Sequence, residues 1–135
     1  MLWAMQAAST WAMVGVIWVI QLVHYPLFAG VGNEQFSRYA QEHSRKITWV
    51  VLPLMSIELT TSYLLWREYH GLWQTVGLWS VGLIWLATGL FFAPLHHKLS
   101  RGFCSRKHRL LVQGNWLRTV LWTLRGGFVF LLPIN

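Results

Sequence analysis

The sequence predicts an all-α polytopic membrane protein, a bundle of four transmembrane helices forming a single membrane domain over residues 1–135. Hydrophobic residues make up 55% of the chain and charged residues only 11%, whereas a soluble domain carries about 25% charged residues. Four stretches, at about 2–25, 47–66, 72–95 and 115–133, each reach the roughly 20 apolar residues that a membrane helix needs. The one cysteine excludes an intramolecular disulfide framework and a cysteine-rich zinc site.

The expected spans differ in their charges. The first and third contain no charged residue, the second contains only Glu58, and the fourth contains Arg118 and Arg125. The first span is longer than the roughly 7–15 apolar residues of a signal peptide and has no basic residue before it, so we interpret it as a retained anchor. Pro53 lies inside the second span and is expected to kink it.

The two long loops, 26–46 and 96–114, are each expected to contain a short interfacial helix. The Tyr25-Pro26 step predicts a break after the first span. Asn33 is a suitable N-cap, and apolar residues recur behind it at helical spacing, which predicts an amphipathic helix leading into the second span. Residues 105–113 alternate basic and apolar side chains by threes and fours, which predicts the second interfacial helix.

The basic residues set the expected orientation. Loops 26–46 and 96–114 hold eight Lys and Arg residues, whereas the opposite side offers only Arg67. Basic residues concentrate in the cytoplasmic loops of membrane proteins. We therefore expect a protein of the cell (inner) membrane with both termini outside and both long loops cytoplasmic. The net charge of +7 is then an orientation signal that also attracts anionic lipid, and a nucleic-acid partner is not expected.

Glu58, Arg118 and Arg125 are ionisable groups inside the expected spans. Each costs roughly 2.5–3.5 kcal/mol to insert, so such groups normally face the bundle interior and have partners. Glu58 and Arg125 both lie about 18 Å from the cytoplasmic end at the helical rise per residue. Equal depth and opposite charge predict a buried ion pair. It can be a structural link that fixes helix register, or a counter-ion or proton-handling pair at the bottom of a cavity.

The polar faces of the four helices are expected to converge at the cytoplasmic end. In the fourth span, polar and aromatic residues spaced by three or four form one stripe. Five of the six histidines also lie at this end: His24, His43, His96, His97 and His108. Adjacent His96 and His97 point to different helix faces, so at most one faces inward. His108 has basic neighbours and is expected to be a solvated loop residue.

Two interpretations of the histidines stay open, because imidazole is both an acid/base group near neutral pH and a common metal ligand. In the first, histidines move protons while Arg118 and Asn115 stabilise an oxyanion such as a phenolate. In the second, they ligate a haem or a metal ion. The catalytic candidates are His24, His43, His96, Asn115 and Arg118. The candidate ligands of a haem or metal, if either is bound, are His24, His43, His96 and His97.

The chain resembles an uncharacterised family of small four-span bacterial integral membrane proteins. The resemblance covers nearly the whole chain and is carried by His24-Tyr25-Pro26-Leu27-Phe28, Glu42-His43, Glu58, Pro94-Leu95-His96, Asn115-Trp116-Leu117-Arg118-Thr119, Trp122 and Arg125-Gly126. The second half more distantly resembles the anthrone-oxygenase-like membrane family, in which Pro-Leu-(Asn) follows the third span; here His96 replaces the usual Asn. That resemblance implies oxidation of a flat aromatic or quinone-like substrate without an obvious bound cofactor.

The sequence thus favours an oxidoreductase that acts on a flat hydrophobic small molecule at the cytoplasmic side of the bilayer. The alternative is a non-catalytic module that binds lipid or pigment, or a small subunit of a membrane complex. Transport of a small ion or metabolite ranks last, because four short spans would have to oligomerise and no pair of broken helices is repeated. The expected partners are membrane lipid and a hydrophobic small molecule, with a homo-oligomer or a membrane-complex partner left open.

Overall fold

The structure, a computed structural model, describes residues 1–102 and 104–130, apart from the side chain of Asn33. Within these residues the chain is all-α and forms four long helical segments, as expected, but the connections between them are shorter than the expected loops 26–46 and 96–114. The elements are α1 (Leu2–Val19), η1 (Ile20–His24), α2 (Tyr25–Phe28), α3 (Asn33–Tyr69), α4 (Leu72–Ala87), η2 (Thr88–Phe92), α5 (Ala93–Leu99) and α6 (Ser105–Val129). The elements η1 and η2 are single π-helical turns.

Three of the described segments are long and apolar enough to cross a membrane: Leu2–Phe28, Glu34–Tyr69 and Leu72–Leu99. The fourth segment, α6, is less apolar because Asn115, Arg118 and Arg125 lie in its otherwise apolar half. All three of these side chains are buried inside the bundle. The polar side chains in this half of α6 therefore belong to the interior of the bundle.

Several expected helix boundaries are wrong. The interfacial helix expected after Asn33 is the first part of the 37-residue α3, and residues 105–113 are the first part of the 25-residue α6. Once a helix has formed, each added residue gains a hydrogen bond, so the helix extends until a strong breaker occurs. Pro53 is not such a breaker, since α3 runs through it.

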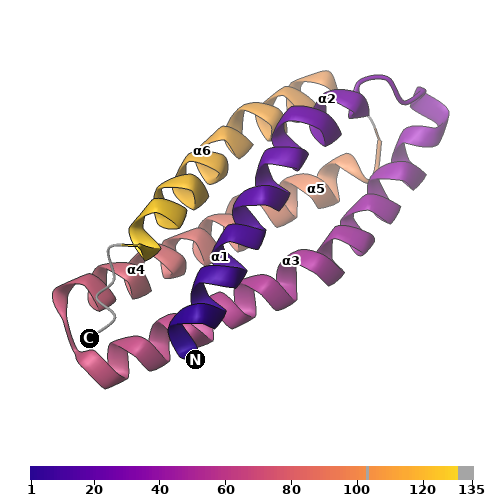
Figure 1. Cartoon of the computed structure of the whole chain (residues 1–135). Coiled ribbons are helices and arrows are strands. Elements are labelled where there is room, and N and C mark those ends of the chain that lie inside the picture. Colours follow the sequence, from indigo (N-terminus) through magenta and orange to yellow (C-terminus); the bar gives the residue numbers. More distant parts are fainter. Residues whose placement is uncertain (103, 131–135) are drawn as a thin grey trace.

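The four segments run alternately up and down (Figure 1). The connections α2–α3 and α5–α6 lie at one end of the bundle, which we call the loop end, and the N-terminus lies at the other. α1 packs against both α3 and α6, and α3 packs against α4. The buried core consists of two clusters. One lies in the middle of the bundle and contains Met13, Ile17, Met55, Ile84 and Trp122. The other lies near the loop end and contains Tyr25, Phe28, Phe36, Phe92 and Leu111.

A buried ion pair ties the helices together away from the loop end. Arg125 Nε donates a hydrogen bond to Glu58 Oε1, and the two side chains are 1% and 0% exposed. The other polar atoms of both groups also have partners, on α1, α3 and α4. Glu58 Oε2 accepts from Ser9 and Thr10, and Arg125 donates to Gly77 O, Ser80 Oγ and Ser62 Oγ. Because the polar atoms of both side chains have hydrogen-bond partners, the pair has the geometry of a structural link.

Candidate functional site

Two of the helical segments contain the same local device, a π turn followed by a proline. η1 precedes Pro26, and η2 precedes Pro94. A proline inside an α-helix lacks the N–H, and its ring collides with the carbonyl four residues earlier. A π turn inserts one extra residue where this conflict arises, so the helix continues. The break expected at the Tyr25-Pro26 step is therefore wrong, and the helix continues to Phe28.

The residue before Pro26 forms the first polar contact of the loop end. Tyr25 is 1% exposed, and its hydroxyl lies 2.8 Å from His96 Nε2. The bond joins the first segment to α5. The adjacent His97 is exposed and lies 3.0 Å from Arg101 Nη2, but His96 and His97 both line one cavity, so the expectation that at most one of them faces inward is not confirmed.

A second histidine contact lies next to the first. The rings of His24, at the end of η1, and His43, on α3, have centroids 4.1 Å apart and planes inclined by 33°. The His43 ring is also 5.8 Å from that of His96. Both His24 Nε2 and His43 Nε2 are buried and have no hydrogen-bond partner among the described residues. Buried polar atoms without partners are rare, so these two nitrogens call for an explanation.

Arg118 on α6 is the third unusual group. It is 5% exposed, and its guanidinium carbon lies 4.8 Å from the centre of the Phe92 ring. Its one hydrogen bond in the described part of the chain is a long one, 3.4 Å from Nη1 to Asn115 Oδ1, and Nε has no partner. No carboxylate forms an ion pair with it there. A buried cation without a counter-ion is costly and is a strong indication of an anion-binding position.

Asn115 contacts Arg118 and is itself held in place by hydrogen bonds. Its side-chain amide donates to Gln21 Oε1 at 2.8 Å, and Gln21 in turn donates to the backbone oxygen of Val112 at 3.3 Å. Asn115 is 0% exposed. The residue therefore holds the guanidinium in place, and its own atoms are already engaged with protein.

Arg118, His96, His43 and Tyr25 line one cavity of about 510 Å³ between α3, the η2–α5 region and α6, which we call the inner cavity. Most of its wall is apolar or aromatic, including Val51, Met55, Trp85 and Phe92. Three of its lining residues carry a buried atom without a hydrogen-bond partner in the described residues: His43 Nε2, Ser44 Oγ and Arg118 Nε. The cavity thus combines a cation, neutral hydrogen-bonding groups and flat apolar walls, as small-molecule sites do.

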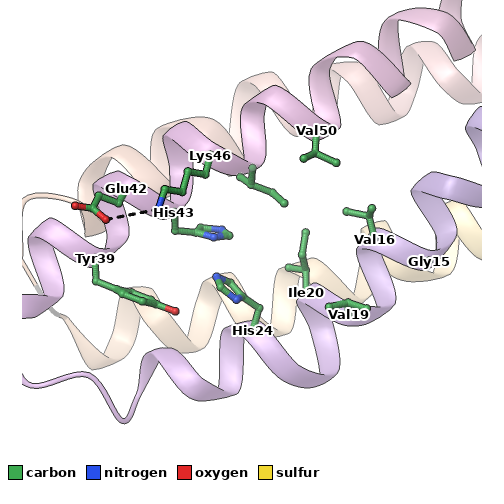
Figure 2. A pocket seen from close by; sticks show the side chains of 11 residues that line it. Gly15, Val16, Val19, Ile20, His24, Tyr39, Glu42, His43, Lys46 and Val50 are labelled. Atoms are coloured by element: carbon green, nitrogen blue, oxygen red, sulfur yellow. Dashed lines mark ion pairs between the residues drawn. The ribbon is translucent and has the colours of Figure 1, made fainter.

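A second cavity, of about 610 Å³, lies between α1 and α3, and we call it the α1–α3 groove. Figure 2 shows the side chains of His24 and His43, which both line this cavity, pointing toward each other from the first segment and from α3. His43 lines both cavities. Of the five catalytic candidates, the structure therefore places His43, His96 and Arg118 on the inner cavity, His24 on the groove, and Asn115 behind Arg118.

Sequence reasoning missed Tyr25 and Ser44 as site residues, and it misjudged His108. Tyr25 belongs to the predicted helix break and to the residues that carry the family resemblance, and a tyrosine before a proline at the end of an apolar span is a usable signal of a site residue. His108 is not a solvated loop residue. It lies in α6, and its Nε2 atom is 2.9 Å from the backbone oxygen of Tyr25.

The histidines do not form a conventional metal site in this structure. Within the described ranges, no group of three or more His, Cys, Asp or Glu side chains is arranged to hold a metal ion. His96 is engaged with Tyr25, and His97, which also lines the inner cavity, contacts Arg101. Comparisons with protein-family models, with curated proteins and with solved structures found no match.

Proposed function

We propose that this protein is a four-span membrane oxidoreductase that binds a flat hydrophobic molecule with an acidic hydroxyl group in the inner cavity. The observation that carries the proposal is Arg118, a buried guanidinium without a carboxylate partner in the described residues, at the wall of an apolar cavity. A phenolate or enolate oxygen supplies the missing negative charge, and the aromatic walls accommodate a planar ring.

The proposed chemistry begins with a proton transfer. His43 lines the same cavity as Arg118, and its Nε2 atom has no partner among the described residues, so we assign to it the role of accepting the hydroxyl proton of the substrate. Arg118 stabilises the resulting oxyanion, and Asn115 holds Arg118 in position. The Tyr25–His96 pair supplies a hydrogen bond beside the reacting oxygen. The oxyanion loses an electron more readily than the neutral hydroxyl compound, so the deprotonation that these residues carry out prepares the substrate for oxidation.

The proposed substrate enters from the lipid, between α3 and the η2 region. Leu52 on α3 is 49% exposed and lines the cavity, and Leu90 on η2 is 67% exposed. An apolar rim of this kind admits a hydrophobic molecule without passage through water. A non-catalytic module that binds lipid or pigment remains the alternative, and turnover of a bound hydroxyl compound separates the two.

Filling the inner cavity tests whether it is the binding site. Gly89 lines it, and an added Cβ there meets no atom within 4 Å, so Gly89→Phe is expected to fill the cavity while the helix stays intact. We expect this variant to lose binding of 1-naphthol, a hydroxyl-bearing flat probe, as measured by naphthol fluorescence. Gly82→Phe is the matched control, because Gly82 also has an open Cβ position and lies in neither cavity. Equal binding by both variants contradicts the proposed site.

The proposed topology has four spans, both termini outside the cell membrane and the α5–α6 connection in the cytoplasm. Cys104 lies in this connection and is the one cysteine of the chain. The backbone N–H of Lys107, then that of Arg106 and the charges of both residues, lower the pKa of the Cys104 thiol. The reactive thiolate is therefore more abundant at pH 7 than for an ordinary cysteine, and it declines as the pH falls below this lowered pKa.

We expect a membrane-impermeant maleimide to label Cys104 in inverted membrane vesicles and not in intact cells. Labelling in vesicles should persist at pH values where an ordinary thiol reacts slowly. A Cys104→Ser variant controls for labelling elsewhere. Labelling of Cys104 in intact cells would show that the orientation is the reverse of the one proposed. A cytoplasmic location of a reporter fused at residue 135 would show the same.

A further inference from the structure

We propose that the α1–α3 groove is a second binding site, which holds one membrane phospholipid with its phosphodiester at the Lys46 end and an acyl chain along α1. The inference rests on the proposed membrane location, and it does not depend on the reaction proposed for the inner cavity. Figure 2 shows the polarity on which it is based: Tyr39, Glu42, His43 and Lys46 lie toward one end, and Gly15, Val16, Val19 and Val50 toward the other. Such a gradient matches a molecule with a polar head and an apolar chain.

The apolar end has room for a chain and opens on the outer surface. An added Cβ at Gly15 would meet no atom within 4 Å, so the glycine leaves space along the groove. A glycine inside a helix costs stability relative to alanine. At position 15 the glycine leaves open space in the groove in return. Val19 and Val50, which flank the opening, are 60% and 46% exposed. In a bilayer these valines contact lipid chains, so one chain can lie in the groove without leaving the hydrocarbon region.

The polar end offers the cation Lys46. Glu42 and Lys46 both line the groove and lie 3.9 Å apart, and Arg38, which is not among the lining residues, also pairs with Glu42, at 3.3 Å. The Lys46 side chain is 73% exposed, so it can turn toward a phosphate oxygen while Arg38 keeps its pair with Glu42. Lys46 then presents one positive charge, which complements one phosphodiester.

His24 supplies a neutral hydrogen-bonding group in the groove. Its Nε2 atom lacks a partner within the described chain, and the residue lines the groove but not the inner cavity. The glycerol esters of a phospholipid lie closer to the bilayer centre than its phosphate and present carbonyl oxygens that accept hydrogen bonds. The order cation, imidazole, aliphatic wall thus follows the order phosphate, ester, acyl chain. A free phosphate ion would leave the apolar half of the groove unused.

Native mass spectrometry of the delipidated full-length protein in detergent, titrated with phosphatidylglycerol, tests this site. We expect one lipid to bind more tightly than all later ones. Gly15→Phe should weaken this first binding about tenfold or more, because the ring displaces methylene groups of the chain. Gly82→Phe and Gly89→Phe should leave it unchanged. Lys46→Gln should weaken it about fivefold, whereas Lys98→Gln, an exposed cation outside the groove, should not.

Three results would overturn the proposal. Wild-type affinity of Gly15→Phe excludes the groove as the site. Effective competition by glycerol phosphate, which has no chain, indicates a simple phosphate site. Equal affinity for diacylglycerol, which has no phosphate, shows that the head is not recognised. Naphthol binding is measured separately on the wild type and the same variants. If the wild type binds the lipid but not naphthol, only the proposed function is disproved.

Discussion

Glu58→Gln is expected to lower the free energy of unfolding by about 3–5 kcal/mol, the usual cost of leaving a buried charge without its partner. The substitution keeps the shape of the side chain but removes the only carboxylate that pairs with Arg125 among the described residues. The hydroxyls of Ser9 and Thr10, which donate to Glu58, would then face an amide. Denaturation of the purified protein in mixed micelles, followed by circular dichroism, measures the change.

Two controls show whether this effect comes from the buried charge. Glu42→Gln removes a carboxylate that is 44% exposed and paired at the surface, and it should cost less than about 1 kcal/mol. The double variant Glu58→Leu/Arg125→Met removes both charges and should be more stable than Glu58→Gln alone. If Glu58→Gln is as stable as the wild type, the pair is not a structural link, and a proton-handling role for Glu58 gains support.

Arg118→Gln is expected to reduce turnover of the proposed substrate about 10²- to 10³-fold, the usual effect of removing one donor that stabilises an oxyanion. The same change should raise the pH at which bound 1-naphthol ionises, since the guanidinium favours the naphtholate over the neutral form. The pH titration of naphthol fluorescence in the presence of protein measures this directly. It requires no knowledge of the natural substrate.

Arg118→Gln should leave the fold intact, in contrast to Glu58→Gln. Arg118 has no ion pair in the described residues, so its removal does not leave an opposite charge buried. Arg118→Lys is the matched variant: it keeps the charge but loses the planar donor group, and it should restore part of the shift in naphthol ionisation. An unchanged titration in Arg118→Gln, with naphthol still bound, contradicts the role proposed for Arg118.

Much of the fold could be predicted from composition and spacing. Long uncharged apolar stretches leave a chain little choice but helices, since every backbone group in an apolar environment must be paired internally. The pairing of Glu58 with Arg125 followed from depth alone, because the rise per residue is nearly constant along a helix. The structure contains both the helices and the ion pair. The fourth span and the orientation in the membrane stay proposals.

The composition of the candidate site could be predicted only in part. His43, His96 and Arg118 were expected at one end of the bundle and do line one cavity. The partner of His96, Tyr25, was not expected, and His24 was not separated from the others. The reason is local: a π turn adds one residue to a helix and rotates every later side chain by about 100°. Counting by threes and fours therefore fails after residue 20 in the first segment and after residue 88 in the third.

The sequence by itself determined the helical class, the apolar segments and the depth of each polar group, because these depend on composition and on distance along one helix. Only the tertiary structure decided which cavity each polar group faces, because that depends on the rotation of each helix about its axis. The division of the histidines is the clearest example: His43 lies between two cavities, with His24 on one and His96 on the other. The π turns of the first and third segments rotate His24 and His96, and the packing of the four helices then places each of them on its cavity.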